Sequence, residues 1–172
     1  MNLQSTDFEI FGLPPAFALD RARLDERWKA LQREAHPDRH AAADAQTQRQ
    51  AMQWSVRINE AYQRLKDPIK RAAYLCELHG APVEAENNTR MPPAFLVQQM
   101  EWREALEEAS TLDALEDMAD EVAGARTRMI EEARRLADEQ RDFAGLAGQV
   151  RALMFVERFA RDVEGRIDQL GQ

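Results

Sequence analysis

The sequence contains a single cysteine and only seven glycines and seven prolines in 172 residues. One cysteine, Cys76, cannot form an internal disulfide and excludes a zinc site built from several cysteines. Few glycines and prolines favour helix. No apolar run approaches the ~18 residues of a membrane span, and the polar first residues do not resemble a signal peptide. We therefore expect a soluble, intracellular, helical protein in which Cys76 is a buried structural thiol.

An overall excess of basic residues is also missing, since the formal net charge is −8. Residues 1–80 contain 12 basic and 11 acidic side chains, whereas residues 81–172 contain 11 basic and 20 acidic ones. This asymmetry indicates two modules with different partners. Nucleic acid is not an expected partner, because the basic footprint that it requires is absent.

The chain does have helical periodicity, with apolar residues recurring at spacings of three and four. Helices are predicted at 20–35, 43–65, 68–80, 93–109, 111–139 and 142–170, after a short one near Phe8 and Phe11. Residues 81–92 lack this periodicity and contain turn-forming residues, which is typical of a linker. We predict an all-α fold, with an N-terminal domain (1–80) based on a helical hairpin, a linker (81–92) and a C-terminal three-helix bundle (93–172).

A distinctive polar motif, His36-Pro37-Asp38, separates the first two long helices. Pro37 lacks a backbone N–H and disfavours helical geometry at the residue before it, so the first helix should end by about Ala35. The motif then lies at the tip of a helical hairpin. In the preceding helix, Lys29 and Arg33 fall opposite the apolar stripe. They form either a solvated charged face or, beside this motif, a docking surface.

The helix from Pro93 has more apolar residues than one core stripe requires. Phe95, Trp102 and Leu106 share one face, at about 100° per residue. A second set lies outside that stripe and comprises three apolar residues with three carboxylates at their edge, Leu96, Val97, Met100, Glu101, Glu104 and Glu108. In the last helix, Phe155 points well over 90° away from the Leu146–Val150–Leu153 stripe.

An apolar patch with a charged rim is typical of a protein-binding surface, and acidic residues favour a basic partner. Two alternatives remain, since a three-helix bundle can bury wide arcs and the patch could pack on the N-terminal hairpin.

Catalytic motifs are not found. His36 and His40 have the i, i+4 spacing of a metal pair, but Pro37 prevents the helix that would align them. Pro37 also occupies the glutamate position of the H-E-x-x-H pattern, and no glycine-rich phosphate loop exists. No nucleophile accompanies His36 and Asp38. We expect no enzyme activity, catalytic residue, metal or cofactor.

The N-terminal half resembles a J-domain. The resemblance rests on Asp7-Phe8, Phe11-Gly12-Leu13, the helix ending in His36-Pro37-Asp38, Asn59-Glu60-Ala61-Tyr62 and Asp67-Pro68. In that family, the His-Pro-Asp loop and the basic face of the preceding helix dock on a DnaK-type chaperone ATPase and stimulate ATP hydrolysis. The resemblance implies a chaperone-binding surface at His36, Pro37, Asp38, Lys29, Arg33, Arg39 and Arg27. Asp25, Glu26 and Glu34 dilute its positive charge.

Further segments resemble the HscB family, the J-type co-chaperones of iron–sulfur cluster biogenesis. They are Arg71-Ala72-Ala73-Tyr74-Leu75, Leu78-His79-Gly80, Ala94-Phe95-Leu96 and Met100-Glu101, so the resemblance covers nearly the whole chain. It implies that the C-terminal domain binds an IscU-type cluster scaffold and presents it to a specialised HscA chaperone. The family's scaffold-contact positions fall on Leu96, Val97, Met100, Glu101, Glu104, Glu108 and Phe155.

The resemblance further implies a bacterial, cytoplasmic, monomeric adaptor that binds no membrane and ligates no cluster, since the cysteine-pair zinc module of some eukaryotic relatives is absent. One rival is a general J-protein that delivers unfolded clients, which a single small patch with a fixed acidic edge disfavours. The other is a structural protein that oligomerises through the bundle with a degenerate J-domain. The intact His36-Pro37-Asp38 disfavours it.

Overall fold

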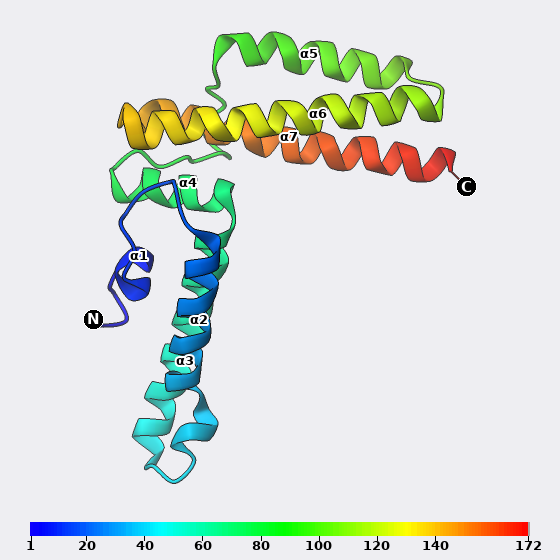
Figure 1. Ribbon diagram of the computed structural model, residues 1–172. Helices are drawn as coiled ribbons and strands as arrows, with labels where there is room; N and C mark the ends of the chain where they lie inside the picture. Colours follow the sequence, from blue (N-terminus) through cyan, green and yellow to red (C-terminus); the bar gives the residue numbers. More distant parts are fainter. Residues whose placement is uncertain (172) are drawn as a thin grey trace. The chain divides into compact units, whose positions relative to one another are not determined.

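The structure, a computed structural model, describes residues 1–171 apart from the side chain of Pro37 (Figure 1). Every regular element within that range is a helix, which confirms the predicted all-α class. The chain divides into two compact units, Met1–Leu75 and Cys76–Gln172. The exact domain and linker boundaries stay a prediction. No helix within residues 1–171 combines the length and apolarity needed to cross a membrane.

The N-terminal unit is organised around two antiparallel helices that lie side by side in Figure 1, α2 (Arg21–Ala35) and α3 (Ala45–Lys66). The other elements are α1 (Asp7–Phe11), the 3₁₀ turn η1 (Pro37–His40) and α4 (Pro68–Leu78), which continues past the unit's end. Leu24, Ile58 and Leu65 are buried between them. Trp28 stacks on Tyr62 with ring centroids 4.6 Å apart. The predicted hairpin is therefore confirmed.

Local capping signals set the helix ends. The Asp20 side chain accepts a hydrogen bond from the backbone N–H of Arg23, so α2 begins where its N-cap predicts. It ends at Ala35, because His36 takes the extended conformation (φ −60°, ψ 132°) expected before proline. α4 begins at Pro68, whose missing N–H is not needed in a first turn.

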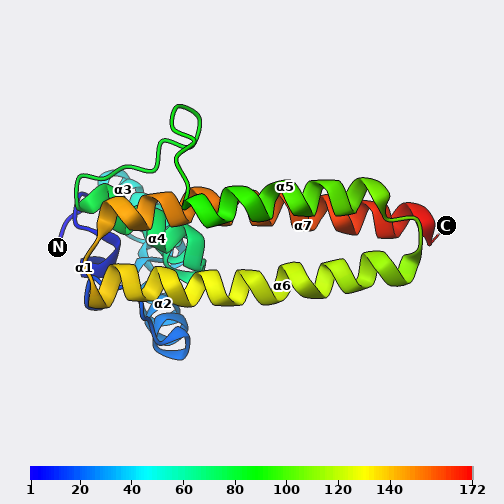
Figure 2. The same ribbon diagram turned by 90° about the horizontal axis from the view of Figure 1, so that it is seen from above.

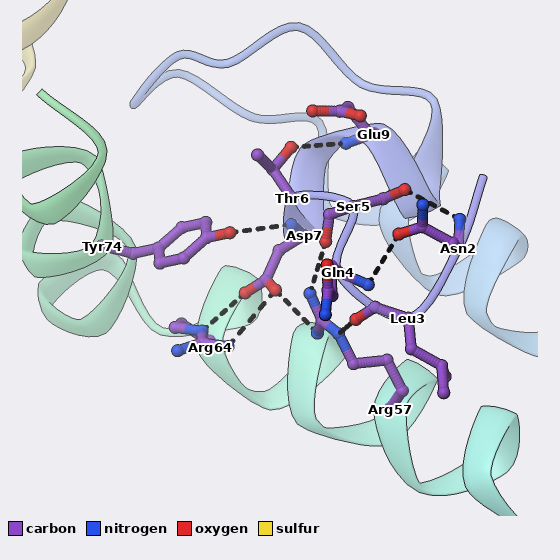
Figure 3. Close-up of polar contacts among 10 residues, drawn as sticks. All are labelled: Asn2, Leu3, Gln4, Ser5, Thr6, Asp7, Glu9, Arg57, Arg64 and Tyr74. Carbon is purple, nitrogen blue, oxygen red and sulfur yellow. Dashed lines mark hydrogen bonds and ion pairs between the residues drawn. The ribbon is translucent and has the colours of Figure 1, made fainter.

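The N-terminal segment is fastened to α3 and α4 through Asp7, whose side chain is fully buried (Figure 3). Its carboxylate lies 2.8 Å from Nη1 of Arg57 and 2.6 Å from Nε of Arg64. The backbone N–H of Asp7 donates to the Tyr74 hydroxyl at 2.9 Å. Arg57 also donates to the carbonyl of Ser5 at 2.8 Å. These contacts hold α1 against the hairpin.

The C-terminal unit is the predicted three-helix bundle, formed by α5 (Pro93–Glu108), α6 (Leu112–Arg134) and α7 (Phe143–Leu170) (Figure 2). Its core includes Phe95, Trp102, Met118, Val122, Phe155, Val156, Phe159 and Val163. The last turn of the predicted 111–139 helix is a π-helix, η2 (Arg135–Glu139), which the apolar spacing did not predict.

Residues 81–92 form an ordered arm along α7. Arg151 of α7 donates from Nε to the carbonyl of Arg90 at 2.6 Å and from Nη1 to the carbonyl of Val83 at 2.7 Å. Val83 is also buried. The arm has no regular secondary structure, as its sequence predicts, but α7 fixes its path.

Candidate binding surfaces

The His-Pro-Asp motif lies between the end of α2 and the 3₁₀ turn η1. His36 Nδ1 accepts a hydrogen bond from the backbone N–H of Asp38 at 3.2 Å. The Asp38 carboxylate lies 3.6 Å from the same nitrogen, and the His36 and Asp38 side chains are 57% and 94% exposed. Pro37 begins the turn, but its side chain lies outside the described residues. The motif thus presents an imidazole and a carboxylate to solvent.

All four basic residues assigned to chaperone docking are exposed, but one of them is held by a hydrogen bond to the backbone. Lys29, Arg33 and Arg39 are exposed and form no ion pair within the part of the chain that the structure describes. Lys29 and Arg33 lie on α2 away from the buried Leu24, as predicted. Arg27 differs, because its Nε donates to the carbonyl of Phe11 at 2.7 Å. This bond ties α1 to α2 and restricts the Arg27 guanidinium.

One of the carboxylates expected to dilute the basic face is already paired. Asp25 accepts hydrogen bonds from Arg21 at 2.9 Å and from the Tyr62 hydroxyl at 2.8 Å. The Arg21 guanidinium, with help from Tyr62, lowers the pKa of Asp25. Its negative charge is therefore offset locally and subtracts less from the positive face of α2 than the sequence suggests.

The surplus apolar residues of α5 are exposed. Leu96, Val97 and Met100 are 45%, 57% and 72% exposed, whereas Phe95 and Trp102 on the other side of the helix are 8% and 3% exposed. The carboxylates at their edge are also exposed. The prediction that these six residues lie outside the bundle core is confirmed. We call them the α5 patch, made of Leu96, Val97, Met100, Glu101, Glu104 and Glu108.

The prediction that Phe155 points away from the core is wrong. Its side chain is only 3% exposed, and its ring lies 5.7 Å from that of Phe95 and 5.9 Å from that of Phe159. The Arg103 guanidinium covers the ring at 5.0 Å. The reason is that α7 is buried on most sides, since between Leu146 and Val156 only Gly148 and Met154 are partly exposed. A single-stripe helical wheel underestimates such a helix, and Phe155 supports α5 from beneath.

Arg151, which is only 6% exposed, was not predicted as a buried residue. A signal was present, because Arg151 is the one charged residue in the run from Phe143 to Val156. A charge inside an apolar helical run is usually buried and partnered. Apolar periodicity in this run indicates core residues and does not reveal a buried charge among them.

Comparison with known proteins identifies the family. A family model described as the HscB C-terminal oligomerisation domain matches residues 91–164. A co-chaperone HscB homologue of Burkholderia multivorans is 47% identical over 173 residues, covering 99% of this chain and 98% of the relative. The chain belongs to the HscB family. An HscB homologue of Ralstonia nicotianae is likewise 47% identical, with 99% of both chains covered.

Solved HscB structures agree with this fold. The chaperone HscB from Vibrio cholerae shares 36% identity with a TM-score of 0.80, over 96% of this chain and 99% of that one. Human co-chaperone HscB gives a TM-score of 0.87 at 23% identity, over 96% of this chain and 84% of that one, a likeness of fold alone. HscB membership gives this chain a co-chaperone role in iron–sulfur cluster biogenesis.

Within residues 1–171, no group of three or more His, Cys, Asp or Glu side chains could hold a metal ion. Cys76 is fully buried, and burial raises the pKa of its thiol from about 9 to about 12. Burial therefore makes this thiol harder to ionise than an exposed cysteine. The predicted buried structural thiol matches this placement.

Proposed function

We propose that this HscB-family protein is a two-headed adaptor for iron–sulfur cluster transfer. Its α5 patch binds an IscU-type scaffold, and its His-Pro-Asp loop, with Lys29, Arg33 and Arg39, binds an HscA/DnaK-type chaperone. It stimulates the ATPase of that chaperone and has no catalytic activity of its own. It works as a monomer in the bacterial cytoplasm and binds neither nucleic acid nor membrane.

The α5 patch is the observation that carries this proposal. Three large apolar side chains are exposed on a helix whose opposite side is buried, and carboxylates surround them. Such an anatomy, with an apolar centre and a polar rim, is typical of protein-binding surfaces. Its small size favours one folded partner over many unfolded clients. The carboxylates favour a scaffold with a basic face and speed its approach.

The proposed chaperone contact of the His-Pro-Asp loop is supported by the exposure of its side chains and by its backbone conformation. Pro37 favours the extended backbone of His36, and this places two polar side chains at the hairpin tip. Contacts that these residues make only with the hydrolysis-competent chaperone would shift the chaperone toward that state. The adaptor then adds positioning, while the chaperone carries out ATP hydrolysis.

The direct test is the steady-state ATPase of the cognate chaperone with scaffold and this protein added singly and together. Combined Leu96→Ala, Val97→Ala and Met100→Ala should remove the synergy with scaffold and keep the basal stimulation. His36→Gln should remove both. Leu170→Ala is the matched control, because Leu170 is an exposed apolar residue outside the patch. Stimulation that ignores both the scaffold and the triple variant would leave only a general J-protein.

Self-association is the competing function, because the matching family model is described as an oligomerisation domain. Measuring the molar mass by light scattering at several protein concentrations distinguishes a monomeric adaptor from a self-associating protein. A mass that stays that of one chain supports the adaptor. A concentration-dependent dimer that the triple variant dissociates would reassign the α5 patch to contact between copies.

A further inference from the structure

Arg151 is a buried cation whose charge has no acidic partner. It is 6% exposed, and its two hydrogen bonds go to the backbone carbonyls of Val83 and Arg90. Within residues 1–171 it forms no ion pair with any carboxylate. Carbonyl dipoles solvate a guanidinium only in part, and a buried charge without a counter-ion is costly. The site therefore favours an anion from solution.

The third nitrogen of the Arg151 guanidinium is available for such an anion. Nη2 makes no hydrogen bond within the described chain, and Arg151 lines a pocket of about 400 Å³ between the 81–92 arm and the start of α7. Gly148 keeps this side open, since a Cβ built there would lie 3.9 Å from Nη2 and 3.7 Å from the carbonyl oxygen of Arg90. Any larger side chain at Gly148 would extend into the pocket.

The charge of the pocket is opposite to that of its surroundings. Residues 81–172 contain 20 acidic side chains, yet none of them is among the residues that line the pocket. Arg90 and Arg151 are among the residues that line it, and so is the uncharged Asn88. Pro82, Met91 and Ala144 add apolar wall. Guanidinium groups bind carboxylate and phosphate oxygens strongly, and the volume suits a small ligand.

We propose that this pocket binds an oxyanion, a carboxylate or phosphate group carried on a small body, through Arg151 Nη2 and the Arg90 side chain. The ligand is the counter-ion that Arg151 lacks. Because Arg151 also holds the arm, a bound oxyanion fastens residues 81–92 more firmly to α7. The site shares no residue with the α5 patch or the His-Pro-Asp loop, so it does not depend on the function proposed above.

The test uses the full chain and follows the Nε–H resonance of Arg151 by ¹⁵N NMR. Inorganic phosphate and propionate are titrated separately, with chloride keeping the ionic strength constant. We expect a saturable shift with at least one of them. Saturation by phosphate alone, by propionate alone or by both identifies a phosphate, a carboxylate or a general oxyanion site.

Two variants test the site without changing Arg151 itself. Arg90→Gln should raise the apparent dissociation constant about tenfold, because one charged hydrogen bond to the oxyanion is lost. Gly148→Leu should abolish the saturable shift by filling the pocket, and leucine is a better helix former than glycine. The control is Arg161→Gln, an exposed arginine elsewhere on α7 that should bind as the wild type does. A shift that chloride reproduces, or that Gly148→Leu leaves intact, would overturn the proposal.

Discussion

At the scale of single residues, Asp7 concentrates the strongest polar interactions of the N-terminal unit. Asp7→Asn keeps the side-chain size but leaves the Arg57 and Arg64 guanidinium groups without their carboxylate. We expect the free energy of unfolding to fall by about 3 kcal/mol, as when one partner of a buried ion pair is removed. Urea denaturation measures this. Asp20→Asn is the control, because asparagine caps a helix as well as aspartate does. Equal stability of the two variants would contradict the prediction.

Gly12 and Gly165 make a matched pair for backbone strain. Gly12 ends α1 at φ +62°, and a Cβ there would collide with the Arg27 guanidinium, whereas Gly165 is helical with open space around it. We expect Gly12→Ala to destabilise the protein by about 1–3 kcal/mol and Gly165→Ala to stabilise it by about 0.5–1 kcal/mol. Thermal unfolding of both variants reveals the signs. A stabilising Gly12→Ala would show that the turn does not need the left-handed conformation.

Cys76 gives a pH dependence with a definite sign. The pKa of its thiol is raised from about 9 to about 12 by burial, so the unfolded chain loses this proton at a lower pH than the folded one. Its contribution to stability is therefore complete below pH 9 and is lost as the pH rises toward 12. The free energy of unfolding should fall more steeply between pH 9 and 11 in the wild type than in Cys76→Ala. Parallel curves would mean that the folded thiol ionises normally.

Some residue environments could not be predicted from the sequence, and Asp7 and Phe155 show why. The partners of Asp7 are far away in the chain, and no local pattern announces them. Phe155 was misplaced because a helical wheel assumes one buried stripe, whereas α7 is buried on most sides near its middle. Local spacing did place Leu96, Val97 and Met100 outside the core, because α5 buries only one side.

At the scale of elements, α5 presents the residues proposed to bind the scaffold, and α7 supplies the core that supports α5. Met100 is 72% exposed, so Met100→Ala should leave the free energy of unfolding within about 0.5 kcal/mol and still weaken scaffold binding about fivefold or more. Phe155→Ala should cost about 3–5 kcal/mol of stability, because it empties part of the core. Denaturant unfolding and calorimetric titration of both variants test this. A Phe155→Ala protein of full stability would place that ring in the interface after all.

The helix boundaries were predictable for a different reason from the rest of the fold. N-cap residues and prolines act over three or four residues, so Asp20, Asp67-Pro68 and Asp142 could be recognised from sequence alone. No short pattern encodes the π-helical turn at the end of α6, or the path of residues 81–92, which Arg151 of α7 fixes by hydrogen bonds.

At the scale of the whole molecule, the uneven charge predicts how salt acts on scaffold capture. Changing Glu101, Glu104 and Glu108 together to glutamine should lower the association rate several-fold at low salt and affect dissociation less. High salt should remove the difference, because it screens exposed charges. Stopped-flow binding measures both rates. The control changes Glu131, Glu132 and Glu139 to glutamine, which alters the net charge equally. An identical loss in the control would reduce the effect to net charge.

The expected partners come from the resemblance to known families, whereas the exposed apolar residues of α5 follow from helical spacing alone. The first 80 residues are nearly neutral and the rest are acidic, and the structure divides into two units at a similar point, between Leu75 and Cys76. Arg27 shows the limit of transferring a family's docking residues, since its guanidinium is engaged with the carbonyl of Phe11. Only the folded chain shows which cations are free.

The fastening of Asp7 has a consequence for biosynthesis. Its hydrogen bonds reach 57 residues forward to Arg64 and 67 forward to Tyr74, so α1 cannot dock until those residues have been made. At about 5–20 residues per second, a ribosome takes roughly 3–13 s to cover that distance. Until then Phe8, Ile10 and Phe11 cannot reach the buried positions that they have in the finished protein. A newly made co-chaperone is thus, for several seconds, itself a substrate that general chaperones can recognise.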